Sequence, residues 1–360
     1  MQRRRFLATL AAATAAPTLS WADAGNPAFL AAARDRDGRF AIWGLAADGT
    51  RLFSQPLPDR GHAATAHPTR PEAVAFARRP GTFALVIDCA TGRLRAQLTP
   101  PEGRQFNGHG AFSGDGMRLY TSEVVADGSA GRIGVWDVAR GYVRVGEFSS
   151  NGIGPHEILR LPGTETLVVA NGGIQTDPQD RTKLNIDTMR PNLSYLSSQG
   201  EVIEVVELPQ DLRQNSIRHL ARRSDGLVAF CMQWQGDLME PVPLLGLHRL
   251  GARAPVLANP APAEILAMNG YAGSVAFARG GREVGITSPR GGMVQVYDAD
   301  TGAPVWSVRR ADVCGLGPCA SGGFTATDGQ GLVAQIADQT LIPFARADVA
   351  WDNHLVTLDL

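Results

Sequence analysis

The chain has 360 residues, of which 44% are hydrophobic and 19% charged, and its formal net charge at pH 7 is −1. This composition can build a sizeable apolar core, and it lacks the basic balance of a protein that binds nucleic acid. Glycine and proline are abundant, with 41 and 23 residues, whereas lysine occurs only at Lys183. Together with many short runs of β-forming residues, these features favour an all-β protein over a helical one.

The first residues have the features of an export leader. An arginine triplet at 3–5 has Phe-Leu directly behind it, an Ala-rich apolar run ends near Leu19, and a small-x-small motif stands at 22–24. A twin arginine in this setting indicates the Tat route. The apolar run is too short to cross a hydrocarbon layer of about 30 Å as an anchor. We therefore expect residues 1–24 to be a Tat signal peptide, and the mature chain to lie in the periplasm without a membrane span.

A repeat follows the leader. At three places an apolar strand-like run ends in Asp, and Gly follows four residues later: Asp88 and Gly92, Asp137 and Gly141, and Asp298 and Gly302. The Asp side chain can accept hydrogen bonds from turn amides, and Gly supplies the positive φ that such hairpins need. These positions predict strand-to-strand hairpins at regular intervals.

Histidines give the period of the repeat independently. His62, His109 and His156 are spaced 47 residues apart, and the step from His156 to His219 is 63 residues. The longer step contains the segment 172–192, which carries an insertion of about 16 residues, and subtracting those residues restores the period of 47. Four short strands in a unit of this length are typical of a propeller blade.

The repeat predicts one domain over residues 25–360, an all-β, seven-bladed β-propeller. Blade one is expected to take strands at 29–33, 40–45 and 51–57, and the last stretch, 349–360, should supply its innermost strand. Joining both chain ends in one sheet would leave no open seam. The predicted blades begin near Phe29, His62, His109, His156, His219, Tyr271 and Gly322.

The same chain resembles the DUF1513 family. The motifs that carry the resemblance lie at 106–116, 119–123, 151–157, 169–174, 183–185, 188–189, 216–220, 271–276, 288–292 and 312–315. The resemblance implies a Tat-exported periplasmic propeller of the YVTN or quinoprotein type. It also implies a setting of iron acquisition, with imelysin-like or di-haem peroxidase-like periplasmic proteins as partners.

Five histidines are expected to gather at the central funnel, because each stands near the start of an innermost strand. They are His62, His109, His156, His219 and His354. Several imidazoles around one axis could hold a transition metal, iron or copper. The alternative is structural, in which each histidine only ties neighbouring strands within its blade.

The register of these strands leaves a second choice open. His109 and His219 stand one residue later than His62 and His156, and adjacent residues of a strand point to opposite faces. Without a bulge, Arg218 would face the funnel in place of His219. The guanidinium of Arg218 would then be offered to a carboxylate or phosphate. Glu157 is a further candidate funnel residue.

Two loops and one cysteine pair are additional candidates. The insertion at 172–192 carries Lys183 and is either functional or a solvated decoration. Arg290, in a predicted blade-six loop, is either an anion ligand or part of a plain turn. Cys314 and Cys319 form a C-x4-C pair that could close a small disulfide in an oxidising compartment.

Two classes of function follow. The first is a non-catalytic binding or scaffold propeller associated with iron or other metal uptake. The second is a lactonase- or dehydrogenase-like enzyme that uses the funnel as its active site. The sequence has no G-x-S-x-G, P-loop, H-E-x-x-H or C-x-x-C-H motif. Propeller lactonases hold their metal with carboxylates and Asn, whereas this funnel is rich in His, so binding is favoured over hydrolysis.

Overall fold

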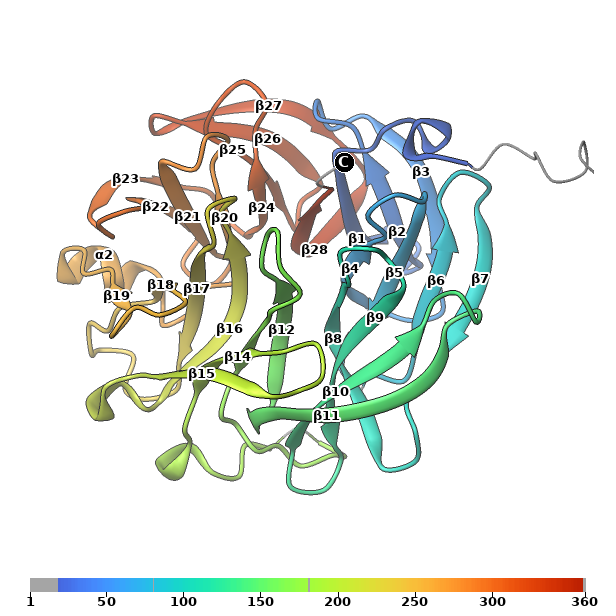
Figure 1. Cartoon of the computed structure of the whole chain (residues 1–360). Helices are drawn as coiled ribbons and strands as arrows, with labels where there is room; N and C mark the ends of the chain where they lie inside the picture. Colours follow the sequence, from blue (N-terminus) through green and yellow to red (C-terminus); the bar gives the residue numbers. More distant parts are fainter. Residues whose placement is uncertain (1–18, 80, 181, 359–360) are drawn as a thin grey trace, which may run out of the picture.

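Strands account for most of the chain. The computed structural model describes residues 19–79, 81–180 and 182–358, and there the strands form seven four-stranded antiparallel sheets around one axis (Figure 1). Each sheet is one blade, with its innermost strand beside the axis and its outermost strand at the rim. The predicted seven-bladed β-propeller is confirmed.

From the axis outward, blade one consists of β28 (Val349–Thr357), β1 (Phe29–Asp35), β2 (Phe40–Leu45) and β3 (Arg51–Leu57). Blade two consists of β4 (Gly61–Ala66), β5 (Glu72–Ala77), β6 (Ala84–Asp88) and β7 (Arg93–Leu98). Blade three consists of β8 (Arg104–Phe112), β9 (Arg118–Val125), β10 (Ala130–Asp137) and β11 (Val143–Ile153). Blade four consists of β12 (Pro155–Arg160), β13 (Leu167–Asn171), β14 (Asn192–Leu196) and β15 (Val202–Glu207).

Blade five consists of β16 (Asn215–Arg222), β17 (Leu227–Trp234), β18 (Leu245–Arg249) and β19 (Val256–Leu257). Blade six consists of β20 (Ser274–Phe277), β21 (Glu283–Ser288), β22 (Met293–Asp298) and β23 (Pro304–Arg309). Blade seven consists of β24 (Val313–Pro318), β25 (Phe324–Asp328), β26 (Leu332–Ala337) and β27 (Thr340–Arg346). Short helical turns lie outside the blades: η1 (Trp21–Ala24), η2 (Ile186–Thr188), η3 (Gln210–Leu212) and α2 (Pro262–Ala267).

The ends of the chain close the ring as predicted. β28 pairs with β1 in an antiparallel register that runs from Phe29 opposite Thr357 to Asp35 opposite Val349. The innermost strands contact one another in cyclic order, from β28 through β4, β8, β12, β16, β20 and β24 back to β28. A sheet built from both termini removes the seam at which an open array would expose an unpaired edge.

The Asp-to-Gly hairpins adopt the geometry that the sequence predicts. Asp88 ends β6, and its Oδ1 accepts hydrogen bonds from the amides of Ala90 at 3.1 Å and Thr91 at 2.9 Å. Gly92 then has φ of +71°. A side chain that satisfies the turn amides and a glycine in the left-handed region together bring the outermost strand back along the blade.

The core lies between the blades. The two middle strands of a blade are buried on both faces, as in β13, where every residue is buried. The outermost strands alternate between partly buried and exposed residues, as in β15. Buried layers such as Leu193, Tyr195, Ile217 and Phe230 connect blades four and five. Apolar surface removed from water between neighbouring sheets therefore holds the ring together.

Blade seven begins earlier than the sequence predicted. The expected start near Gly322 is wrong, because β24 already covers Val313–Pro318 and Gly322 lies in the turn before β25. The run of Cys, Gly and Pro in β24 has no alternation of polar and apolar residues, so the sequence does not mark it as a strand. Its residues from Val313 to Gly317 are all buried in the ring.

The predicted leader lies largely outside the described residues, which begin at residue 19. The end of the predicted leader forms η1, which packs onto the propeller. Trp21 and Ala24 are buried there in a cluster with Ile42 and Leu57. The indole Nε1 of Trp21 donates a hydrogen bond of 3.1 Å to the carbonyl oxygen of His67. Within the described part of the chain, no helix is both long and apolar enough to cross a membrane.

Candidate functional site

Bulges in the innermost strands bring the five predicted histidines to one place. In β16, Ile217 pairs with Met232 and His219 with Cys231, so Arg218 is an extra residue in its strand. Comparable register shifts occur in β4, β8, β12 and β28, at or beside their histidines. A bulge re-aims the side chains that follow it. The different offsets in the sequence are therefore compensated, and all five rings converge on the axis.

The five rings form one compact group, which we call the histidine cluster: His62, His109, His156, His219 and His354. Ring centroids are 4.5 Å apart for His219 and His354, 4.6 Å for His156 and His219, and 4.8 Å for His109 and His156. Two trios each offer three ring nitrogens within 4.8 Å of one another, and His109 belongs to both. The trios are His62, His109 and His156, and His109, His219 and His354.

Burial decides the protonation of the cluster. All five side chains are between 2% and 9% exposed. Loss of hydration lowers the pKa of each imidazole below its ordinary value of 6.5, and it lowers the pKa of His219 to about 3. The rings are thus neutral at neutral pH, which is the form that binds metal.

Four ring nitrogens of the cluster lack hydrogen-bond partners among the described residues. Nδ1 of His62, Nε2 of His109, Nδ1 of His219 and Nε2 of His354 are buried and unpaired. The remaining two histidines of the chain differ: His248 contacts the Tyr195 hydroxyl at 2.8 Å and the Ala252 carbonyl at 3.1 Å. Nδ1 of His67 accepts the amide of Arg70 at 3.0 Å. Structural histidines of this chain are therefore paired, whereas those of the cluster are not.

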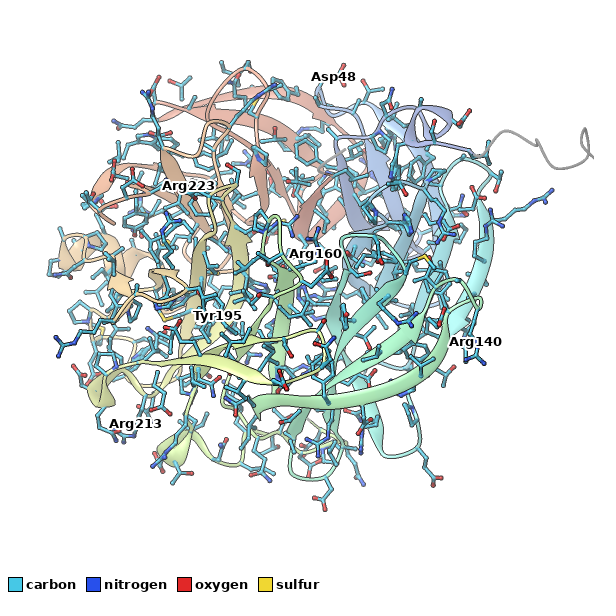
Figure 2. All side chains as sticks on the ribbon, viewed as in Figure 1. Asp48, Arg140, Arg160, Tyr195, Arg213 and Arg223 are labelled. Carbon is cyan, nitrogen blue, oxygen red and sulfur yellow. The ribbon has the colours of Figure 1, made fainter. Side chains whose placement is uncertain are left out.

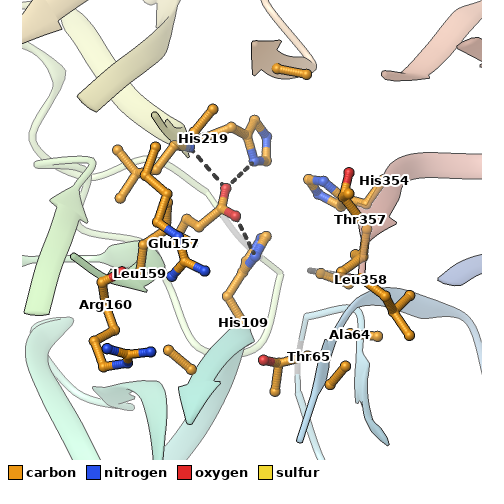
Figure 3. A pocket seen from close by; sticks show the side chains of 18 of the residues that line it. Ala64, Thr65, His109, Glu157, Leu159, Arg160, His219, His354, Thr357 and Leu358 are labelled. Carbon is orange, nitrogen blue, oxygen red and sulfur yellow. Dashed lines mark hydrogen bonds and ion pairs between the residues drawn. The ribbon is translucent and has the colours of Figure 1, made fainter. Parts of the chain in front are cut away.

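Glu157 stands between two members of the cluster. Its Oε1 lies 3.8 Å from Nδ1 of His109, and its Oε2 lies 3.4 Å from Nδ1 of His219 (Figure 3). Oε2 also accepts a hydrogen bond of 2.9 Å from the amide of Leu220. Burial raises the pKa of Glu157, and the neighbouring His109 opposes this effect. The carboxyl group is placed to orient both rings through their Nδ1 atoms.

A cavity of about 530 Å³ opens onto the cluster from one end of the channel. Its walls come from the innermost strands beyond the histidines, and His109, His219, His354 and Glu157 line it (Figure 3). Arg160 lines it as well and lies near the axis of the ring, whereas Arg140 and Arg213 lie toward the rim (Figure 2). Glu157 is the one carboxylate among the described lining residues.

The other predicted cations lie at the opposite end, where the innermost strands begin. Arg218 precedes His219 in β16 and is buried, at 8% exposure. Lys183 lies in the insertion between β13 and β14, and its Nζ donates a hydrogen bond of 2.5 Å to Oε1 of Gln235. Arg290 lies in the turn between β21 and β22, with its guanidinium carbon 4.4 Å from the centroid of the Tyr271 ring.

Cys314 and Cys319, which the sequence offers as a possible disulfide, are not bridged in this structure. Both residues are free and buried. Cys314 Sγ donates toward the carbonyls of Thr327 and Trp351, each at 3.5 Å, whereas Cys319 Sγ contacts Ser321 Oγ at 3.2 Å. The extended strand β24 separates the two thiols, and a disulfide needs Cα atoms within about 7 Å.

One contact within the site was not predicted from the sequence. Gly108, directly before His109, has φ of +92° and lies against the ring of His62. The motif Asn-Gly-His-Gly in this segment contained a signal, because a glycine beside a buried histidine often marks a close approach of the backbone.

Comparisons with known proteins agree with this architecture. A family model described as "Protein of unknown function (DUF1513)" matches residues 55–358. No curated protein matches the chain. Among solved structures, it is similar to Kuenenia stuttgartiensis hydrazine synthase, with 13% identity, a TM-score of 0.59, and coverage of 86% of this chain and 89% of that chain. At this identity the likeness shows the fold alone. Since the family model spans most of the sequence, the chain belongs to the DUF1513 family, with a YVTN- or quinoprotein-like propeller as its fold.

Proposed function

We propose that this protein binds a transition metal ion, iron or copper, in the histidine cluster and serves metal handling as a non-catalytic binding propeller. The observation that carries the proposal is the convergence of five buried, neutral imidazoles, four of which have a buried ring nitrogen without a hydrogen-bond partner. Burying an unpaired polar group costs about 1–3 kcal/mol. Four such atoms are a substantial cost, and a metal bound by the cluster would relieve it at the atoms that the ion contacts, while Nδ1 of His219 faces Oε2 of Glu157.

The donor set fits a borderline metal. Imidazole suits iron, copper, nickel and zinc, whereas carboxylate-rich sites suit magnesium and calcium. Among the described residues, the cluster has five imidazoles with one adjacent carboxyl group, Glu157. With Glu157 facing the Nδ1 atoms of His109 and His219, their Nε2 atoms remain available to the ion. Such carboxylate–histidine pairs commonly fix the ring orientation at metal centres.

The proposal includes a place of action. We propose export through the Tat route and work in the periplasm, supported by the arginine triplet and apolar run at the start of the sequence. Partners of imelysin-like or di-haem peroxidase-like type, in iron acquisition, are proposed from family resemblance alone. Fusion of residues 1–24 to a folded reporter tests the route. Export should depend on the Tat translocase and stop when Arg3, Arg4 and Arg5 are all changed to Lys.

The metal is tested by titrating the full chain, freed of metal by a chelator, with Fe(II) under anaerobic conditions and with Cu(II). We expect stoichiometric binding of one of these ions. His109→Gln should weaken it most among the single variants, because His109 belongs to both trios. His248→Gln is the matched control, since both nitrogens of that ring already bond Tyr195 and Ala252. The proposal would be refuted if neither ion bound, or if His109→Gln and His248→Gln bound the ion equally well.

A second candidate, an enzyme, is favoured by the cavity of about 530 Å³ that ends on Glu157. Burial raises the pKa of this carboxyl group, as in general acids and bases. Assays with a panel of lactones, and with alcohols plus an artificial electron acceptor, test the lactonase- and dehydrogenase-like alternatives. Turnover that disappears in Glu157→Gln while the fold survives would support the enzyme over the binding protein.

A further inference from the structure

A group of cations lies at the end of the channel opposite the cavity, and we call it the cationic mouth: Arg218, Lys183 and Arg290. They come from three separate segments, namely β16, the insertion of blade four and the β21–β22 turn. These segments meet here because each adjoins the end of the ring at which the innermost strands begin. Neither the proposed metal site nor the cavity uses these three side chains.

Direct contacts connect the segments. Lys183 Nζ bonds Oε1 of Gln235, and Gln235 Nε2 bonds the carbonyl of Gln233 at 2.8 Å. Gln233 forms a β-bridge with Tyr271, over whose ring Arg290 lies. The two exposed cations are therefore held by one continuous set of residues.

The same set reaches the innermost strand of blade one. Nδ2 of Asn353 donates a hydrogen bond of 3.3 Å to the hydroxyl of Tyr271, and Asn353 directly precedes His354 of the histidine cluster. On the opposite side of the channel, Arg218 directly precedes His219. The cationic mouth thus adjoins the cluster along two different strands.

Arg218 is the informative member, because its side chain is largely buried and has no ion-pair partner among the described residues. It is 8% exposed, its Nε has no hydrogen-bond partner, and among the described residues its guanidinium has no carboxylate partner. An unpaired buried charge is strongly unfavourable, and proteins avoid one unless a counterion is bound. Arginine also cannot escape this cost by losing its proton.

The other charges of the mouth have the same sign. The pKa of Lys183 is lowered by burial and then by the positive charges of Arg218, Arg290 and Arg79. Like charges at close range repel one another, so their collection here opposes folding in the absence of an anion. Lys183 and Arg290 are exposed and approachable, whereas Arg218 lies deeper and has the rigid, forked donor geometry that matches a carboxylate or phosphate.

We infer that the cationic mouth binds a small multivalent oxyanion, with Arg218 making the buried contact and Lys183 and Arg290 closing on it from outside. The inference goes beyond the proposed metal function and does not depend on it. An anion held there would lie beside Arg218, the residue that directly precedes His219 in β16. Carboxylate and phosphate share the recognising chemistry, and the test separates them.

Calorimetric titration of the metal-free full chain at low salt, with citrate and with inorganic phosphate, tests the inference. We expect binding of at least one anion, weakened at least about tenfold in Arg218→Gln, which is the usual scale for a charge-assisted contact. Lys183→Gln should weaken it less. Arg309→Gln is the control, because Arg309 is exposed on the outer strand β23. Tighter citrate binding identifies a carboxylate ligand, and tighter phosphate binding identifies a phosphate.

Thermal unfolding of Arg218→Met without added anion separates a binding role from a structural one. If Arg218 awaits an anion, removing its unpaired charge raises the melting temperature while binding is lost. A lower melting temperature, no binding of either anion by the native chain, or equal binding by the native chain and Arg218→Gln would overturn the inference. Because the protein is metal-free throughout, these outcomes are independent of whether the histidine cluster binds iron or copper.

Discussion

Gly108 approaches His62 so closely that a Cβ atom at position 108 would lie 2.4 Å from Cδ2 of the imidazole. β4 of blade two and β8 of blade three therefore meet at this point. β8 contributes the backbone of Gly108, which has no side chain, and β4 contributes the imidazole of His62. Two requirements coincide at this glycine: the positive φ of +92° and the space for the ring. The position of His62 depends on both.

Gly108→Ala should destabilise the protein and displace His62. Backbone strain of this kind costs about 1–3 kcal/mol, and the clash with the ring adds to it. Urea unfolding measures the loss, with Gly103→Ala as the matched control. Gly103 has φ of +72° but nothing within 4 Å of an added Cβ, so it carries the backbone strain alone. Equal losses in both variants would show that His62 does not depend on Gly108.

Glu157→Gln should weaken metal binding without removing a ligand. The variant keeps the size of the side chain but loses the charge that favours Nδ1–H on His109 and His219, and outer partners of this kind are worth about 10–100-fold in affinity. Competition titration with a chromophoric chelator measures the change. Glu207→Gln, at an exposed position of β15, is the control. An unchanged affinity in Glu157→Gln would remove Glu157 from the metal site.

Much of the architecture was predictable because blades repeat. The hairpin at Asp88 and Gly92 recurs at corresponding places, and the 47-residue spacing of the histidines fixes the size of one unit. Such local signals are independent of distant contacts, so they predict the seven blades and the closing strand. Where the repeat is weak, as before Gly322, the same reasoning misplaced the start of a blade.

The site was predicted as a set of residues but not as a geometry. Strict alternation along a strand placed Arg218 or His219, but not both, at the funnel. The bulge between Ile217 and His219 resolves this conflict, and its extra residue has no distinguishing composition. The pairing of Glu157 with two rings from other blades likewise depends on distances across the axis. The bulge leaves no mark in the composition of its strand, and the pairing of Glu157 depends on contacts between blades, which explains why the sequence did not predict them.

The cysteine thiols should make the protein less stable in alkali. Burial raises the pKa of Cys314 from 9.0 to about 12. Above pH 9 the unfolded chain therefore releases this proton while the folded chain retains it, so stability is present below pH 9 and declines as pH rises toward 12. The decline is about 1.4 kcal/mol per pH unit for one such thiol.

Urea unfolding at pH 8, 9 and 10 measures this dependence, and Cys314→Ala should flatten it relative to the native chain. Thiol counting accompanies the measurement: the unfolded protein should show four free thiols, and the native protein at pH 8 should show slow reaction at Cys89 and Cys314, where burial raises the pKa to about 12. Two thiols in the unfolded, unreduced protein would restore the disulfide between Cys314 and Cys319.

Trp21 should contribute to stability although it lies in the predicted leader. Its side chain is 5% exposed, and its indole bonds the carbonyl of His67 in blade two. Removing a buried tryptophan costs about 3–5 kcal/mol, of which the hydrogen bond is about 1 kcal/mol. Trp21→Ala should lower the unfolding free energy by about 3 kcal/mol, whereas Leu19→Ala, at a 39% exposed position, should leave it unchanged.

The contact between η1 and the propeller also allows the cleavage position of the predicted leader to be tested. A chain that starts at Gly25, directly after the small-x-small motif, lacks η1 altogether, so it should lose the burial of Trp21 and Ala24 and uncover the apolar residues Ile42 and Leu57 that they contact. A chain that starts at Leu19 retains the whole contact and serves as the reference. We expect the shorter chain to unfold at a lower urea concentration than the reference chain. Its unfolding free energy should fall by the amount that Trp21→Ala loses. Equal midpoints for the two chains would mean that η1 rests on the propeller without stabilising it, and that cleavage after Ala24 leaves the folded domain intact.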